Sequence, residues 1–93
     1  MDQLQEIILR VQHMEAILDT LREAFRRDPE SVWQDEPLRD LLRQLTAYYD
    51  GGQWLRDYET DEAGLLPKDL KRGVLSEDAV YNFLADISGA KEE

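Results

Sequence analysis

The stretch LQEIILRVQHMEAILDTLREAF, residues 4–25, carries the strongest structural signal in the chain. Large apolar side chains recur in it seven residues apart, and a second set follows the first by three residues. Together they form what we call the heptad stripe: Leu4, Ile7, Val11, Met14, Leu18, Leu21 and Phe25. This a/d spacing predicts an amphipathic helix from Asp2 to Arg27. The helix is expected to end at Asp28-Pro29, because proline disfavours helical geometry in the residue before it.

The polar side of this helix carries two acid–base pairs at i,i+4, Glu6 with Arg10 and Glu23 with Arg27. Pairs of this kind stabilise an isolated helix by a few tenths of a kcal/mol. The apolar side is long, and the segments that follow are shorter. We therefore expect part of the heptad stripe to stay uncovered, which favours a homodimer or a protein partner on this helix.

A second helix is expected directly after the first. Pro29 starts a short turn that tucks Val32 and Trp33 under the long helix, and Asp35 then caps a helix whose first turn holds Pro37. Its apolar face is formed by Leu38, Leu41, Leu42, Leu45, Tyr48 and Tyr49. Residues 51 and 52, both glycine, are expected to end it in the left-handed conformation. The two helices would pack as an antiparallel hairpin.

The last forty residues predict shorter elements. Residues 53–58 have an apolar face of a turn or two, and residues 68–73 fit a single turn closed by Gly73. A final helix is expected from a Ser76 cap, with Glu77 and Asp78 in its first turn, to an end at Ser88-Gly89. No segment alternates as a strand does. The sequence predicts one all-α domain, residues 1–93, with frayed ends at 1–3 and 89–93.

The amino-acid composition excludes some kinds of site and disfavours some kinds of binding partner. The 93 residues contain 21 Asp and Glu against 11 Lys and Arg, a net charge of −10, and no cysteine. Disulfides and thiolate metal sites are excluded. The negative field disfavours nucleic acids and anionic membranes as partners, since both attract cations. The acidic N-terminus lacks the features of a secretory signal, and no apolar run approaches membrane-spanning length, so we expect a cytoplasmic protein.

The segment 54–72 is the main candidate for chemistry. Its acids do not form a calcium loop, because an EF-hand starting at Asp57 needs glycine where Glu62 stands and glutamate where Lys68 stands. His13 is the single histidine and lacks a second strong ligand. We predict no catalytic residue, metal or cofactor. The candidate interaction residues are those that combine acidic, aromatic and basic character: Trp54, Asp57, Tyr58, Glu59, Asp61, Lys71 and Arg72.

Residues 48–82 also carry a recognisable pattern: Tyr48-Tyr49, Gly52-Gln53-Trp54-Leu55, Asp57-Tyr58-Glu59, Asp61-Glu62-Ala63-Gly64, Leu66-Pro67, Leu70-Lys71-Arg72-Gly73-Val74-Leu75-Ser76-Glu77-Asp78 and Tyr81-Asn82. The pattern resembles a small bacterial family known as domain of unknown function 4298, with the likeness clearest over the second half of the chain. The resemblance implies a compact cytoplasmic helical protein and supplies no catalytic residues.

A structural explanation of this pattern is available. Trp54 and Tyr58 would anchor the segment, Gly64 and Gly73 would supply unusual backbone angles, and the acids would bond nearby amides or the basic residues that follow. The functional alternative is a docking surface for a partner or ligand.

Three hypotheses remain. The first is a non-enzymatic interaction module that binds a protein partner or forms a homodimer through the heptad stripe. The second is a small ligand-binding or hydrolytic domain in which Asp57, Glu59 or Asp61, as a base or metal ligand, converges with Lys71 or Arg72. The third is an acidic inhibitor that mimics nucleic acid, with carboxylates spaced along one face.

Overall fold

The computed structural model describes residues 3–76 and 78–92, a part of the chain that is helical and contains no strand. The elements are α1 (Gln3–Arg27), α2 (Ser31–Gln34), α3 (Glu36–Asp50), α4 (Gln53–Glu62), the 3-10 turn η1 (Gly73–Leu75) and α5 (Ala79–Glu92). The predicted all-α fold is confirmed. Among these described helices, none combines the length and the apolar character needed to cross a bilayer.

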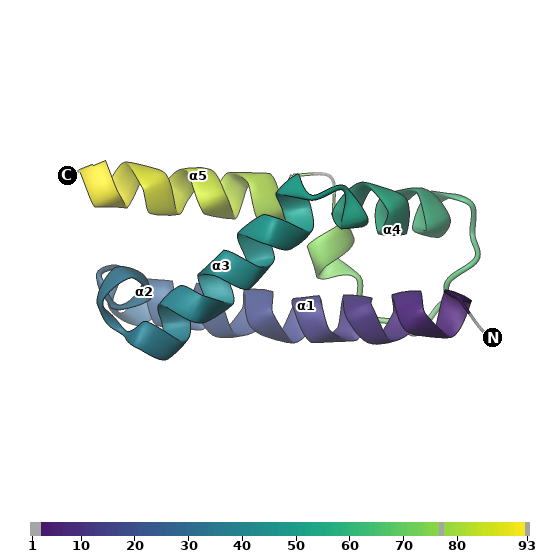
Figure 1. Cartoon of the computed structure of the whole chain (residues 1–93), viewed down its shortest axis with the longest axis horizontal. Coiled ribbons are helices and arrows are strands. Elements are labelled where there is room, and N and C mark those ends of the chain that lie inside the picture. The colour runs from purple at the N-terminus through teal and green to yellow at the C-terminus, as the bar shows by residue number, and fades with distance from the viewer. Residues whose placement is uncertain (1–2, 77, 93) are drawn as a thin grey trace.

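The long first helix sets the frame of the molecule. α1 has 25 residues, which gives about 38 Å at 1.5 Å per residue, and the longest dimension of the molecule is 43 Å. In Figure 1, α3 returns obliquely against the direction of α1, as the predicted hairpin requires. α4 and α5 extend from the top of α3 toward opposite ends, and η1 lies between α4 and α1.

The connection between α1 and α3 is a single helical turn. The Asp28 side chain accepts the backbone N–H of Glu30 at 3.2 Å, and α2 begins at Ser31 rather than at Pro29. Val32 is fully buried, in agreement with the sequence prediction. α3 then begins with the predicted cap, because the Asp35 carboxylate accepts the Leu38 N–H at 3.4 Å.

The two glycines after α3 adopt different backbone conformations at the turn into α4. Gly51 is right-handed, with φ −81°, and Gly52 has φ +93°, a conformation that a side chain would strain. The left-handed glycine that the sequence predicts at the end of this helix is therefore Gly52. α4 is longer than the turn or two expected and includes the whole acidic stretch, so these acids lie on a helix and not on a loop.

The C-terminal elements differ from prediction at their ends. Gly73 begins η1 instead of closing a turn over 68–73. α5 starts at Ala79, so Asp78 and not Ser76 directly precedes it, and the role predicted for Glu77 falls outside the described residues. α5 also passes through Gly89 and ends at Glu92. One glycine inside a helix costs only about 1 kcal/mol and no proline follows, so nothing forces a stop there.

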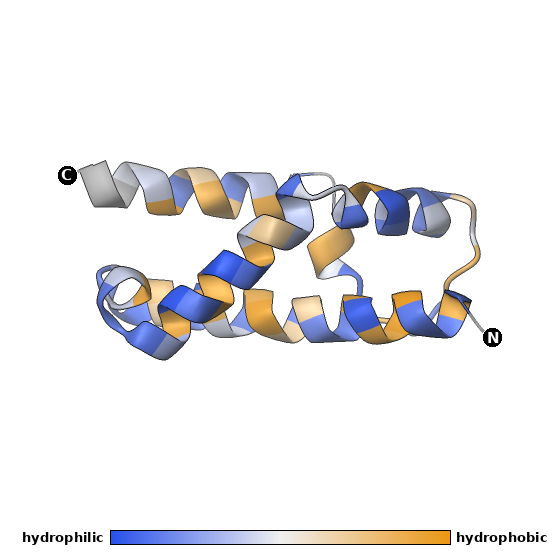
Figure 2. Ribbon diagram, in the orientation of Figure 1, coloured by the Kyte–Doolittle hydropathy of each residue, from blue (hydrophilic) through white to orange (hydrophobic). Residues whose placement is uncertain are grey.

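The core runs along the upper side of α1, where apolar residues recur between polar ones (Figure 2). The middle of the heptad stripe is buried, and Leu4, Ile7 and Phe25 are half-buried against the same core. Phe25 meets Phe83 of α5 edge-on, with ring centres 6.0 Å apart. The chain's own elements therefore cover the middle of the stripe, whereas Leu4, Ile7 and Phe25 near its ends remain partly exposed.

Candidate functional site

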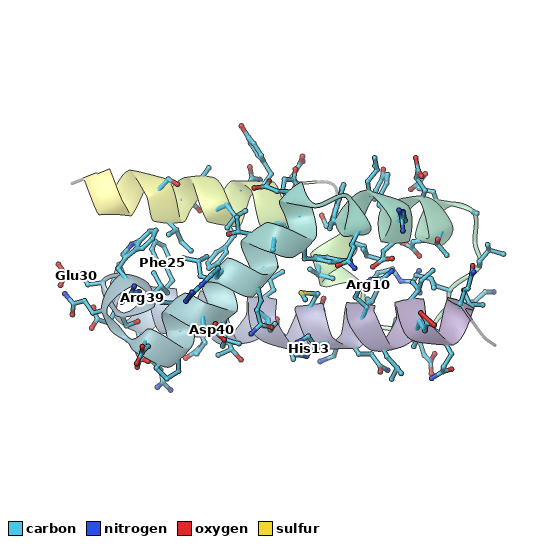
Figure 3. The ribbon with its side chains drawn as sticks, viewed as in Figure 1. Arg10, His13, Phe25, Glu30, Arg39 and Asp40 are labelled. Carbon is cyan, nitrogen blue, oxygen red and sulfur yellow. The ribbon has the colours of Figure 1, made fainter. Side chains whose placement is uncertain are left out.

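The predicted segment centres on Asp57, a charged residue that is completely buried. Its Oδ1 accepts Nη2 of Arg10 at 2.6 Å, and its Oδ2 accepts Nε of Arg10 at 2.9 Å. Oδ2 also accepts the hydroxyl of Tyr48 at 2.7 Å. We call these three residues the Asp57 network. It joins α1, α3 and α4, and Figure 3 shows Arg10 reaching from α1 into the space below α4.

Local sequence explains how α4 buries this acid. Asp57 lies three residues after Trp54 and therefore shares its inward face on the helix. Arg10 lies at the edge of the heptad stripe, one residue before buried Val11. The sequence prediction paired Arg10 with Glu6, but the hydrogen bonds described for Arg10 go to Asp57. The hydrogen bond with Asp57 raises the pKa of Arg10 most, and the charge of Glu6 contributes to the same rise. A bidentate, charge-assisted contact to a buried carboxylate outweighs an exposed i,i+4 pair.

The electrostatics of the network follow from burial and hydrogen bonding. Burial first, and then the hydrogen bond to Asp57, raise the pKa of Tyr48, so that its hydroxyl stays protonated. The hydrogen bond with Asp57 also raises the pKa of Arg10. Both Asp57 oxygens are engaged and the side chain has no exposed surface. This carboxylate is placed to hold three helices together and not to meet a substrate.

Trp54 forms the second anchor of the segment. Its indole N–H donates to the Val74 carbonyl at 2.8 Å, and its ring stacks on Tyr58 with centres 5.1 Å apart. Glu15 of α1 accepts the Val74 N–H at 2.7 Å. A Cβ on Gly73 would stand 3.0 Å from Glu15 Oε2, so the glycine permits this close approach. Of the two glycines predicted to supply unusual angles, only Gly64 has one, at φ +77°.

The remaining predicted residues do not converge on a common site. Arg72 forms an ion pair with Asp61 and donates to the carbonyls of Pro67 and Leu70. The pairing of the acidic stretch with the basic turn is therefore present in the structure. Glu59 and Lys71 are exposed.

An apolar groove lies at the other end of the molecule, between α3 and α5, and we call it the α3–α5 groove. It has a volume of about 390 Å³, within the range of clefts that receive ligands or side chains. It is open to solvent and is lined by Trp33, Arg39, Leu42, Arg43, Thr46, Leu84, Ile87 and Ser88. The sequence prediction placed Leu42, Leu84 and Ile87 on buried helix faces but gave no indication of a groove.

Comparison with protein families identifies the group to which this fold belongs. The model of a family described as a domain of unknown function, DUF4298, matches residues 11–93. The chain belongs to this family. The DUF4298 match starts at Val11 and therefore includes most of α1, so it is not restricted to the second half of the chain.

The DUF4298 match includes Tyr48 and Asp57 and begins one residue after Arg10. Neither a search of curated proteins nor a search of solved structures gave a significant match. The family assignment supports the predicted resemblance and describes no activity.

Two further surface features of this DUF4298 chain bear on the hypotheses. A cleft of about 640 Å³ at the Asp57 end lies between α1 and α4, with Glu59 and Ala63 in its wall. Exposed carboxylates occur on separate helices, among them Asp19, Asp40 and Asp86. Among the side chains that the structure describes, no three from histidine or acidic residues gather closely enough to hold a metal ion.

Proposed function

We propose that this DUF4298 protein is a non-enzymatic interaction module of the bacterial cytoplasm and that the α3–α5 groove holds its protein partner. The observation that carries this proposal is the composition of the groove. Trp33, Leu42, Leu84 and Ile87 line an open depression, while Arg39 and Arg43 supply its charges. Tryptophan and arginine are enriched among the residues that dominate binding energy in protein interfaces.

Burial of apolar surface supplies the driving force. Trp33 and Leu84 are half-buried in the isolated chain, so a partner that covers them removes further apolar area from water. Each square ångström removed contributes about 25 cal/mol. The two walls of this groove come from different helices, α3 and α5, so a segment of a partner that lies between them contacts both.

Contacts of the acids in segment 54–72 support a structural role for this segment. They favour a non-enzymatic module over the hydrolytic alternative. Asp57 binds Arg10 and Tyr48, and Asp61 binds Arg72. A general base or metal ligand needs an accessible oxygen, and Asp57 has none in this arrangement.

The dimeric form of the first hypothesis and the nucleic-acid mimic have less support. A dimer through the heptad stripe would have to displace α2, η1, α3 and α5 from a core that they already share with it. A nucleic-acid mimic would need its carboxylates along one face, whereas exposed acids lie on α1, α3, α4 and α5.

A groove-blocking substitution tests the proposal. Ser88 lies on the groove wall and Ala85 is an exposed residue of the same helix outside the groove. Tagged wild type, Ser88→Trp and Ala85→Trp are expressed in the native host, and copurified proteins are quantified by mass spectrometry. We expect at least one protein that copurifies with wild type and Ala85→Trp to fall by about tenfold or more with Ser88→Trp, which corresponds to 1.4 kcal/mol.

Equal recovery with both tryptophan variants, or no copurifying protein with any of the three, would contradict the proposed function. Circular dichroism of the three purified proteins shows whether each variant keeps its helices.

A further inference from the structure

The charges of the α3–α5 groove indicate what kind of partner it fits. Its only charged lining residues among those described are Arg39 and Arg43, although acids outnumber bases by 21 to 11 in the chain as a whole. Arg39 and Arg43 stand at positions i and i+4 of α3, so they share one side of the helix and face the same edge of the groove.

These two cations are available for a partner. Both are exposed. The ion pair described for Arg43 is with Asp40, at 3.7 Å, and both side chains are more than 60% exposed, at 69% and 61%. A long, solvent-exposed pair of this kind contributes little and is easily exchanged. No ion pair is described for Arg39 within the part of the chain that the structure covers.

We infer that the occupant of the groove is an amphipathic helix of a partner protein that carries apolar anchors flanked by Asp or Glu. This inference rests on the proposed function. A helix laid between α3 and α5 would place apolar side chains at i, i+3, i+4 and i+7 against Trp33 and Leu84. Acidic residues on the edge facing α3 would meet Arg39 and Arg43, whose forked guanidinium groups bind carboxylates bidentately.

The open shape of the groove also favours this occupant over a small molecule. At about 390 Å³ and open to solvent, it accepts a few anchoring side chains but does not enclose a ligand. The net charge of −10 acts against any acidic partner at long range. Salt at physiological ionic strength screens such interactions over about 8 Å, whereas the two arginines act at contact distance.

The test uses a displayed library of helical peptides with randomised surface positions. It is selected in parallel on wild type, on Ser88→Trp, on Arg39→Glu/Arg43→Glu and on a control, Arg22→Glu/Arg56→Glu. The control makes the same change in net charge at exposed arginines outside the groove. The strongest peptides from wild type are then synthesised and their dissociation constants measured against all four proteins.

We expect peptides enriched on wild type to carry Asp or Glu beside an apolar stripe. Their affinity should fall about tenfold or more with Arg39→Glu/Arg43→Glu, a change of 1.4 kcal/mol, and stay within about threefold with the control pair. Selection on the double-glutamate protein should instead enrich Lys and Arg. Amide chemical shifts that change on peptide addition should cluster at the groove.

Three results would overturn the inference. Peptides that lose affinity with Ser88→Trp but show no acidic preference would leave the groove as the interaction site and refute the acidic helix. Enrichment that is no greater on wild type than on Ser88→Trp would refute the helical occupant altogether. A wild type that is dimeric by light scattering, with Ser88→Trp monomeric, would make a second copy the occupant.

Discussion

The two ends of this molecule differ in whether their polar side chains are buried and paired or exposed to solvent. At the end formed by α1, α4 and η1, the buried polar groups meet each other: Asp57 binds Arg10 and Tyr48, and Trp54 binds the Val74 carbonyl. At the α3–α5 end, apolar side chains line an open groove and its two arginines face water.

This difference separates the residues that hold the fold from those that can bind. A buried carboxylate with both oxygens engaged has little left to offer a ligand, and its removal leaves partners unsatisfied. A half-buried tryptophan beside exposed arginines contributes modestly to the stability of the fold. It can contribute more to binding, because a partner that covers it buries the rest of its apolar surface. Substitutions at the first end should therefore change stability, and substitutions at the second should change binding.

The largest effect is expected at Trp54. Trp54→Ala removes a buried ring, its stack on Tyr58 and the bond to Val74, and should lower the free energy of unfolding by about 3–5 kcal/mol. Trp33→Ala removes a half-buried ring in the groove and should lower the free energy of unfolding by clearly less than Trp54→Ala does. Urea unfolding followed by circular dichroism measures the free energy of unfolding of both variants. A loss below about 1 kcal/mol for Trp54→Ala would show that Trp54 does not anchor the fold.

The next effect tests the ion pair. Arg10→Ala leaves the Asp57 carboxylate buried with only Tyr48 as a described partner and should cost about 3 kcal/mol. Arg56→Ala, at an exposed position of α4, serves as the control and should stay within about 0.5 kcal/mol of wild type. The same urea experiment would refute the role of the network if the two variants were equally stable.

A smaller, pH-dependent effect is expected from Tyr48. Its pKa in the folded state is raised above the ordinary value, so the folded chain keeps a proton that the unfolded chain releases. The corresponding stability is complete below about pH 10 and declines as pH rises further, by up to about 1.4 kcal/mol per pH unit. Tyr48→Phe should cost about 1.5–3 kcal/mol at pH 7 and remove this decline. Unfolding curves at pH 7 and pH 10.5 measure it, and parallel losses in the two proteins would contradict it.

The smallest effect on stability is expected at the groove. Arg39→Glu/Arg43→Glu and Ser88→Trp change exposed positions and should each shift the free energy of unfolding by about 0.5 kcal/mol or less per substitution. Thermal and urea unfolding check this. A loss of several kcal/mol would mean that the groove residues maintain the fold, which would remove the contrast between the two ends.

Local patterns predicted much of the fold. The heptad spacing located α1, and Asp35 and the glycine pair located the ends of α3. Those patterns failed where a local rule competed with a distant contact. The i,i+4 rule paired Arg10 with Glu6, but its partner lies 47 residues away in the sequence. The position of Asp57 on the Trp54 face was the signal that this acid must be buried, and it also implied a buried cation to match it.

The groove was beyond prediction for a different reason. Leu42, Leu84 and Ile87 each lie on an apolar helix face, and periodicity identifies such faces correctly. Periodicity does not reveal whether the chain has a further element to fill the space between two faces. That depends on the angle at which α3 leaves α1 and on the direction taken by α5, both of which are set by tertiary packing.

Site-specific crosslinking distinguishes most directly between binding of partners at the α3–α5 groove and binding at the Asp57 end. A photo-reactive amino acid is placed at Thr46 and Ser88, which line the groove, and at Glu59 and Ala63, which line the cleft between α1 and α4. After irradiation of cells of the native host, we predict discrete adducts of higher mass from the first two positions and none from the other two. Adducts from Glu59 and Ala63, with none from Thr46 and Ser88, would instead place the binding site at the Asp57 end.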